Sequence, residues 1–214
     1  AERAVLEVLT RAYPEHGVVA EESGNREGSE YTWVVDPLDG TTNFLHGFPM
    51  FAVSVGVMRG QVLEHGVVYD PLRDEMFTAS RGEGAQLNGK RIRVSTTRQL
   101  APALLGTGFP FRDLEIIEPW MRSFQSLLPK TAGIRRAGAA ALDLAYVAAG
   151  RLDGFWELGL KPWDMAAGAL LIREAGGLMS DVSGDQGFME SGNLVAANPY
   201  IFEDLRKIVA RSVS

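Results

Sequence analysis

An apolar run that leads into two aspartates constrains this chain more than any other segment. Residues 33–43 read Trp-Val-Val-Asp-Pro-Leu-Asp-Gly-Thr-Thr-Asn. A buried strand that ends at the carboxylates of Asp36 and Asp39 is electrostatically costly unless a cation compensates their charge. Hard divalent cations such as Mg²⁺ prefer oxygen ligands of this kind and complete their shell with water and a substrate phosphate.

The residues that follow favour an anion site beside such a cation. Gly40, Thr41 and Thr42 can turn backbone N–H groups and a hydroxyl group toward an anion at the start of a helix. The segment therefore predicts metal ligands and a phosphate-binding turn together. The competing interpretation is that Asp-Pro and Asp-Gly only close a strand, since both are common turn pairs.

Composition narrows the class of protein. The 214 residues suffice for one large domain or two modest ones, and 46% hydrophobic with 22% charged residues is ordinary for a globular chain. The net charge of −6 argues against nucleic acid as the default partner. The absence of cysteine excludes disulfides, thiolate nucleophiles and cysteine-based zinc sites. No apolar run reaches the length of a membrane span, so we expect no membrane partner and a cytoplasmic location.

The pattern of elements changes near residue 100. Residues 1–13 are typical of an amphipathic helix that has already begun, so we expect a truncated N-terminal helix. Short connections between the β-type runs that follow predict antiparallel pairing. The predicted strands of this half are 32–35, 52–58, 62–69 and 75–79, with a hairpin over 86–94.

Helical and strand patterns alternate in the second half, which favours layered α/β packing. The predicted helices are 118–128, 139–149, 164–175 and 200–211, and the predicted strands are 104–108, 153–157, 178–182 and 194–197. We therefore predict an antiparallel-sheet half over 1–98 that carries the main metal motif. An α/β half over 99–214 then carries a second acidic segment and the substrate segments.

Two further segments end in acid. In Lys-Pro-Trp-Asp-Met-Ala-Ala-Gly, Asp164 lies where a helix should begin, and its ordinary role would be an N-cap. In Val-Val-Ala-Glu-Glu-Ser-Gly, an apolar run ends at Glu21, and a solvated loop is the ordinary explanation. Both explanations weaken when the acidic segments are considered together.

In this order the three segments resemble the inositol monophosphatase family of Mg²⁺-dependent sugar phosphatases. The resemblance covers essentially the whole chain, through the pattern Trp-x-x-Asp-Pro-x-Asp-Gly-Thr-Thr-Asn-Phe and the pattern Trp-Asp-x-Ala-Ala-Gly. The segments 138–143 and 155–159 are also similar to family segments. The fold that the resemblance implies is a mixed α/β, layered αβαβα sandwich, with the active site between an antiparallel-sheet half and a smaller α/β half.

The resemblance also implies site residues. The implied ligands of two or three Mg²⁺ ions are Glu21, Asp36, the Leu38 carbonyl, Asp39 and Asp164. The implied substrate contacts are Leu38, Asp39, Gly40, Thr41, Gly138, Ala139, Ala140, Glu157 and Asp164, with Gly40 and Thr41 at the phosphate and Glu157 at a ring hydroxyl. Glu21 and the Thr41 hydroxyl group are the implied catalytic pair that holds the attacking water.

Two departures from the family pattern stand out. By this resemblance we expect the printed sequence to lack the full N-terminal helix and the mobile loop that help to close the site in this family. Ala139 stands where some members carry Thr or Ser, so one hydroxyl contact is missing, although a backbone N–H group at the helix start could replace it.

The leaving alcohol is less constrained than the reaction. We expect an inositol-phosphate phosphatase that acts on a sugar or inositol phosphate, with fructose-1,6-bisphosphate, histidinol phosphate or a nucleotide 3′-phosphate as alternatives in the same fold. An alternative of another class is a non-catalytic protein that binds the metal or a phosphorylated ligand in a regulatory role. Glu157 lies between apolar residues and therefore needs a partner, either a ligand hydroxyl or a salt bridge to Arg135, Arg136 or Lys161.

A homodimer is expected, partly from the resemblance. The apolar stretch Gly-Thr-Gly-Phe-Pro-Phe over 106–111 could cover a partner surface, or it could be a buried strand end.

Overall fold

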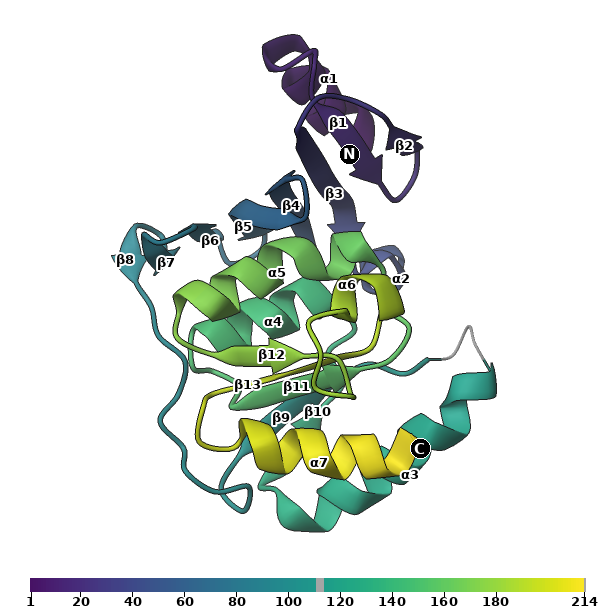
Figure 1. The fold of residues 1–214 in the computed structure, drawn as a ribbon, viewed down its shortest axis with the longest axis vertical. Coiled ribbons are helices and arrows are strands. Elements are labelled where there is room, and N and C mark those ends of the chain that lie inside the picture. Colours follow the sequence, from purple (N-terminus) through teal and green to yellow (C-terminus); the bar gives the residue numbers. More distant parts are fainter. Residues whose placement is uncertain (111–113, 214) are drawn as a thin grey trace.

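Five layers make up the molecule in the computed structural model, which describes residues 1–110 and 114–213 (Figure 1). Helix α1 (Glu2–Ala12) lies outside an eight-stranded sheet, helices α4 (Ala140–Ala148) and α5 (Pro162–Glu174) form the middle layer, and a five-stranded sheet follows. Helices α3 (Ile117–Leu127) and α7 (Phe202–Val213) cover the far side of the second sheet. The predicted αβαβα class is confirmed.

The first sheet contains eight strands in the order β2-β1-β3-β4-β5-β6-β7-β8. Their bounds are β1 Gly17–Ala20, β2 Gly24–Arg26, β3 Tyr31–Asp39, β4 Ala52–Arg59, β5 Val62–Asp70, β6 Glu75–Ser80, β7 Gly84–Leu87 and β8 Lys90–Arg91. All neighbours are antiparallel except β1 and β3, which are parallel. The predicted antiparallel pairing is confirmed for the strands over 32–35, 52–58, 62–69 and 75–79 and for the following hairpin. The parallel pair was not predicted, because β2 returns on the outer side of β1 and β3 then runs along its inner side.

The second sheet has the order β10-β9-β11-β13-β12. Its strands are β9 Leu104–Thr107, β10 Gly133–Arg135, β11 Gly154–Glu157, β12 Leu178–Ser180 and β13 Leu194–Ala197. Short helices complete the chain at α2 (Thr41–Leu45), at α6 (Phe188–Ser191) and at two 3₁₀ turns (Leu114–Ile116 and Leu128–Lys130). The sequence pattern did not predict β2, β10, α2 or α6, because each is too short to show a period.

Apolar side chains form three cores between the layers. Val18, Val35 and their neighbours pack under α1. The largest core joins the first sheet to α4, α5 and the inner face of the second sheet, and a third joins the second sheet to α3 and α7. The proposed division at residue 98 stays a prediction, since the middle helices pack on both sheets.

Helix α5 approaches the first sheet unusually closely. A Cβ atom built on Gly56 of β4 would lie 2.9 Å from the Ala166 Cβ, and one on Gly66 of β5 would lie 2.9 Å from the Ala167 carbonyl oxygen. The Ser54 hydroxyl group also donates to the carbonyl of Trp163 at 3.2 Å. Glycine at these two strand positions therefore lets the helix rest on the backbone of the sheet, which fixes where its N-terminus lies.

Among the described residues, no helix is both long enough and apolar enough to span a bilayer.

Candidate active site

Strand β3 carries Asp36 and Asp39 beyond the point where the sequence pattern predicted its end. Asp36 pairs with Ser54 and Asp39 pairs with Ala52, so three steps on β3 face two on β4. Residues three apart on a regular strand point to opposite faces, but one extra residue shifts this alternation. The bulge therefore turns both carboxylates toward the same place.

Helix α5 brings a third carboxylate to the same point. Carboxylate oxygens of Asp36, Asp39 and Asp164 all lie within 4.8 Å of one another. Asp164 is the third residue of the helix rather than its N-cap, and its Oδ2 accepts the N–H of Lys161 at 2.7 Å. The capping role that we expected is thus present in another form, and it orients an acid that also faces the cluster.

Asp39 joins the two halves of the chain. Its Oδ2 accepts the N–H of Ala141 at 2.8 Å, in the first turn of α4. Ala139 is the N-cap of that helix and supplies no side-chain cap. The Asp39 carboxylate therefore takes the place of a capping side chain while it lies in the acidic cluster.

Burial raises the pKa of the two β3 aspartates. For Asp36 the pKa rises to about 8, first because of burial and then because of the nearby Asp39 charge. For Asp39 the pKa is well above its usual range, again from burial first and then from Asp164. Each carboxylate accepts one backbone N–H and, within the described part of the chain, no bond from a basic side chain.

Such a cluster fits a hard divalent cation. It offers only carboxylate oxygens, without cysteine or histidine ligands, and a positive ion would relieve both the desolvation and the mutual repulsion. The Leu38 carbonyl lies between the two aspartates in the chain and accepts a hydrogen bond from the Thr41 hydroxyl group at 2.9 Å. Thr41 is the first residue of α2, after Gly40 at the N-cap.

Glu21 takes a different position from the three aspartates. It directly follows β1 and is exposed, and its backbone N–H bonds the Val35 carbonyl at 3.3 Å. It lines the same cleft but does not belong to the group of three carboxylates that lie within 4.8 Å.

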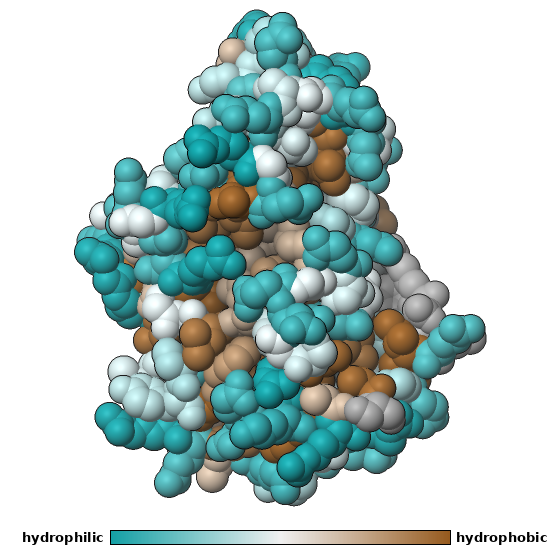
Figure 2. Space-filling model, viewed as in Figure 1, coloured by the Kyte–Doolittle hydropathy of each residue, from teal (hydrophilic) through white to brown (hydrophobic). Residues whose placement is uncertain are grey.

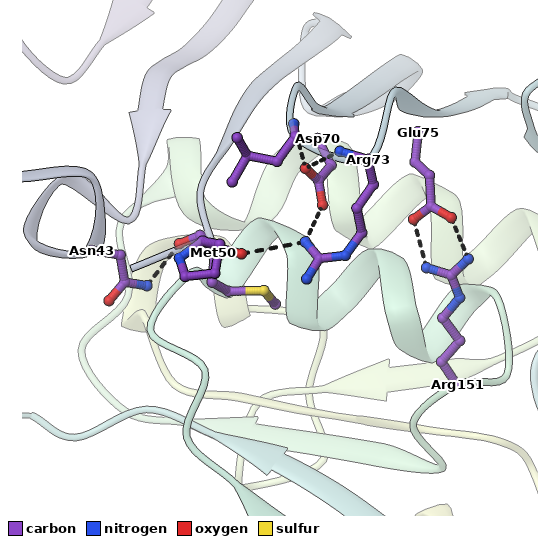
Figure 3. A network of polar contacts seen from close by, with 8 residues as sticks. Asn43, Met50, Asp70, Arg73, Glu75 and Arg151 are labelled. Carbon is purple, nitrogen blue, oxygen red and sulfur yellow. Dashed lines mark hydrogen bonds and ion pairs between the residues drawn. The ribbon is translucent and has the colours of Figure 1, made fainter. Parts of the chain in front are cut away.

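Asn43 ties α2 to the start of α4, a role that the sequence patterns did not indicate. Its amide nitrogen contacts the carbonyls of Met50 (2.7 Å), Ala137 (2.9 Å) and Gly138 (3.2 Å). Figure 3 shows Asn43 pointing toward the segment around Met50, and the Arg73 and Asp70 pair lies on the opposite side of that segment. An asparagine after Gly-Thr-Thr could have been recognised as a donor, but two of its three acceptors are remote in sequence.

The acidic cluster lies at one end of a cleft of about 820 Å³. Loops and element ends from both halves line it, including Gly138, Ala139 and Ala140 before α4, Glu157 at the end of β11, Lys161, Asp164, and Met189, Glu190 and Ser191 of α6. Two further lining residues, Asp143 of α4 and Arg136, were not predicted as members of the site. In Figure 2 the outer contour of the visible face is mostly polar, with apolar residues lying in recesses.

Glu157 is half-buried and has no hydrogen-bond or ion-pair partner among the described residues. Within that part of the chain it forms no hydrogen bond and no ion pair to Arg135, Arg136 or Lys161, so the salt bridge we considered is not seen there. Burial raises the pKa of Glu157 to about 8, helped by the Asp164 charge and opposed by Arg136. The guanidinium of Arg136 lies 4.8 Å above the ring of Phe109.

The stretch 106–111 is divided between core and surface. Gly106, Thr107 and Gly108 are buried, whereas Phe109 is exposed and packs edge-on against Trp120. Phe111 lies outside the described residues. A role of this stretch in a homodimer stays a prediction.

Comparison with known proteins gives the context of this cleft. The Nus factor SuhB of Pseudomonas aeruginosa is 58% identical over 211 residues, which are 96% of this chain and 78% of that protein. The crystal structure of the extragenic suppressor protein suhB from Bartonella henselae superposes with a TM-score of 0.94 at 45% identity, over 97% of this chain and 81% of that one. The inositol monophosphatase of Anabaena (Nostoc) gives 0.93 at 42% identity, over 98% and 84%.

The family model for inositol monophosphatases matches residues 1–214. The resemblance inferred from the three acidic segments is thereby confirmed along the whole length of the chain. The chain therefore belongs to the inositol monophosphatase family, whose members are metal-dependent phosphatases that act on phosphorylated small molecules.

Proposed function

We propose that this chain catalyses the Mg²⁺-dependent hydrolysis of a sugar or cyclitol phosphomonoester of the inositol-1-phosphate type. The observation that carries the proposal is the convergence of Asp36, Asp39 and Asp164 at one end of a cleft large enough for a small phosphorylated ring. Family membership supports phosphatase chemistry.

In this proposal the three aspartates, Glu21 and the Leu38 carbonyl hold two or three Mg²⁺ ions. When bound, Mg²⁺ supplies charge neutralisation at the phosphate and lowers the pKa of water. The chain's own contribution is orientation: Glu21 and the Thr41 hydroxyl group position the attacking water, and Gly40 and Thr41 bind the phosphate. The Thr41 hydroxyl group donates to the Leu38 carbonyl at 2.9 Å, and the second lone pair of that carbonyl oxygen can serve as the metal ligand.

The alcohol part of the substrate would lie against the start of α4 and the end of β11. Gly138, Ala139 and Ala140 line that side of the cleft, together with Glu157. The half-buried carboxylate of Glu157 accepts no hydrogen bond from the described residues, which favours a leaving group rich in hydroxyl donors. We therefore infer a polyol rather than an aromatic or simple alkyl alcohol.

The experiment is phosphate release from a panel of phosphomonoesters with MgCl₂ or with EDTA. We expect the fastest Mg²⁺-dependent release from inositol-1-phosphate, with fructose-1,6-bisphosphate, histidinol phosphate and a nucleotide 3′-phosphate as the alternatives in the panel. Preference for one of those would reassign the substrate but keep the chemistry. Complete inertness with Mg²⁺ would contradict the proposal.

A regulatory binding role is the second candidate, and the name of the relatives favours it. Several relatives are called Nus factors, including the one from Pseudomonas aeruginosa. Inertness on the panel, together with tight Mg²⁺ or phosphate-ester binding, would support this role over catalysis. The homodimer and the cytoplasmic location stay predictions.

A further inference from the structure

Two glycines at the end of strand β9 face the middle layer. Residues two apart on a strand point to the same face, so the α-positions of Gly106 and Gly108 lie on one side, about 7 Å apart. Leu105 and Thr107 point to the other side, where they pack with the α3 and α7 core or bond Trp120. The missing side chains therefore leave space on the cleft side of the sheet.

The Glu157 carboxylate occupies the space beside Gly108, and the Asp143 carboxyl group lies near Gly106. A Cβ atom on Gly108 would collide with the Glu157 carboxylate, whereas one on Gly106 would meet the side chains of Leu152 (3.0 Å) and Phe155 (3.1 Å) and lie 3.5 Å from Oδ1 of Asp143. Asp143 comes from α4 and Glu157 from β11, and both line the cleft. Any larger residue at position 108 would displace the Glu157 carboxylate. Glycine at this position therefore leaves the space that the carboxylate occupies.

The side-chain contacts of Asp143 among the described residues do not indicate a role in stabilising the fold. The residue is only 2% exposed, yet no donor among the described residues bonds its carboxyl group. No fully enclosed side-chain oxygen lacks a partner in that part of the chain, so the Asp143 oxygens must retain access to the cleft. A buried acid without a protein donor, open only toward a cleft, indicates a ligand donor.

We propose that Asp143 is a second hydroxyl-binding group of this cleft, which acts beside Glu157 to bind separate hydroxyl groups of a polyol and so determines substrate choice. The inference rests on the proposed phosphatase function and extends it to a residue that the resemblance did not assign to the site. The Asp143 and Glu157 carboxyl groups line the same cleft, so each can accept a hydrogen bond from a different hydroxyl group of one polyol. Arg136 lines the same cleft and its charge favours the ionised forms of both acids.

The experiment compares two substrates that share the phosphate but differ in the alcohol. D-myo-inositol 1-phosphate and p-nitrophenyl phosphate are assayed at saturating Mg²⁺ with the unmodified protein, Asp143→Asn and Glu157→Gln. Loss of a hydrogen bond to a charged acceptor corresponds to roughly 10- to 100-fold in kcat/KM. We expect that loss on the inositol ester for both variants, and a change of less than about twofold on p-nitrophenyl phosphate.

Asp153→Asn is the matched control. Asp153 is also buried, but it accepts hydrogen bonds from the Ser95 hydroxyl group and the Leu104 N–H and does not line the cleft. Any change that it causes should be equal for the two substrates. If Asp143→Asn is too unstable to assay, Asp143→Ser is the second variant, since it retains a small polar group at the site.

Equal proportional losses on both substrates for Asp143→Asn would overturn the inference and make Asp143 a structural residue. A protein that is inert on both substrates would instead contradict the proposed function. In that case calorimetric titration with inositol 1-phosphate still tests the inference, because Asp143→Asn should weaken binding about 10-fold or more whether or not turnover follows. Unchanged affinity there would overturn it.

Discussion

Two regions of this molecule hold buried carboxylates in different surroundings. At the end of strand β5 in the first sheet, Asp70 accepts the backbone N–H groups of Leu72 and Arg73 and the Arg73 guanidinium at 2.7 Å (Figure 3). In the cleft, Asp36 and Asp39 accept one backbone N–H each.

The difference teaches how to separate structural from functional acids. A buried carboxylate that stabilises the fold accepts hydrogen bonds from protein groups. A buried carboxylate that binds a ligand has oxygen lone pairs that no protein donor uses. Burial raises the pKa of Asp36, Asp39, Asp143 and Glu157 in the cleft, where few protein donors offset the loss of water. Ionising these acids therefore costs free energy in the folded protein, and a bound cation would offset that cost.

The largest expected effect comes from removing a charge from the acidic cluster. Asp39→Asn and Asp164→Asn should each lower phosphatase activity at least about 100-fold, because each removes a proposed metal ligand rather than a residue that only positions a ligand. The melting temperature of the metal-free protein should stay unchanged or rise slightly, because carboxylate repulsion is relieved. Assays across Mg²⁺ concentrations and melting curves in EDTA measure the two effects; near-normal turnover at saturating Mg²⁺ would remove these residues from the metal site.

The opposite result is expected at Asp70, where strand β5 ends. Asp70→Asn should destabilise the fold by about 2 kcal/mol, because it breaks a buried charge-assisted bond to Arg73. That corresponds to a melting temperature lower by about 4–8 °C for a chain of this size. Activity per folded molecule should stay normal. A large loss of kcat in well-folded Asp70→Asn protein would contradict the assignment of Asp70 to the fold rather than to the active site.

The cleft should also give the metal-free protein an unusual pH dependence. The folded-state pKa of Asp36 and of Glu157 is about 8, whereas unfolded carboxyl groups titrate near pH ~4. Between about pH 4 and 8 the folded state therefore binds more protons than the unfolded state, and the free energy of unfolding falls as pH rises.

Because Mg²⁺ binds the ionised carboxylates, its stabilisation should increase across the same window. Melting curves with EDTA or excess MgCl₂ should differ by several degrees near pH ~8 and hardly at all near pH ~5. In Asp36→Asn the increase in melting temperature caused by Mg²⁺ should depend less on pH. The same Mg²⁺ effect at both pH values would show that protons and metal do not compete in the cleft.

The smallest expected effect lies in the Arg151 and Glu75 pair, which also belongs to the fold (Figure 3). The two side chains form two hydrogen bonds of 2.6 Å, but the arginine is partly exposed. Glu75→Gln should lower stability by about 0.5–1 kcal/mol, since Arg151 still lies over the ring of Tyr146. Thermal melting checks this prediction. A loss of stability as large as that of Asp70→Asn would mean that burial does not explain the difference between the Arg73–Asp70 and Arg151–Glu75 pairs.

Local patterns in the sequence were sufficient for the class of fold and for much of the site. The long strands β4, β5 and β6 and the helices α3, α5 and α7 lie close to their predicted ranges, because each is long enough to show its period. Asp36, Asp39 and Asp164 could be grouped from the sequence alone, since the two motifs that carry the family resemblance contain all three.

Residues with ordinary local surroundings were not predicted. Asp143 lies in an alanine-rich helix and Asn43 in a short one, and neither stands out until the elements around it are packed. The parallel pairing of β1 and β3 was missed for the same reason, because it depends on a three-residue strand that no pattern reveals.

By itself the sequence determined the chemistry of the site: oxygen ligands for a hard cation, a turn for an anion and no thiol or histidine cluster. Only the tertiary structure decided which of these groups meet. The bulge in β3 turns Asp36 and Asp39 to one side, and Asp39 bonds Ala141, which is 102 residues away in the chain. Glycines in β4, in β5 and at the end of β9 set how closely α5, Asp143 and Glu157 approach. Such distances arise from packing between layers, and packing depends on side chains that are neighbours only after the chain has folded.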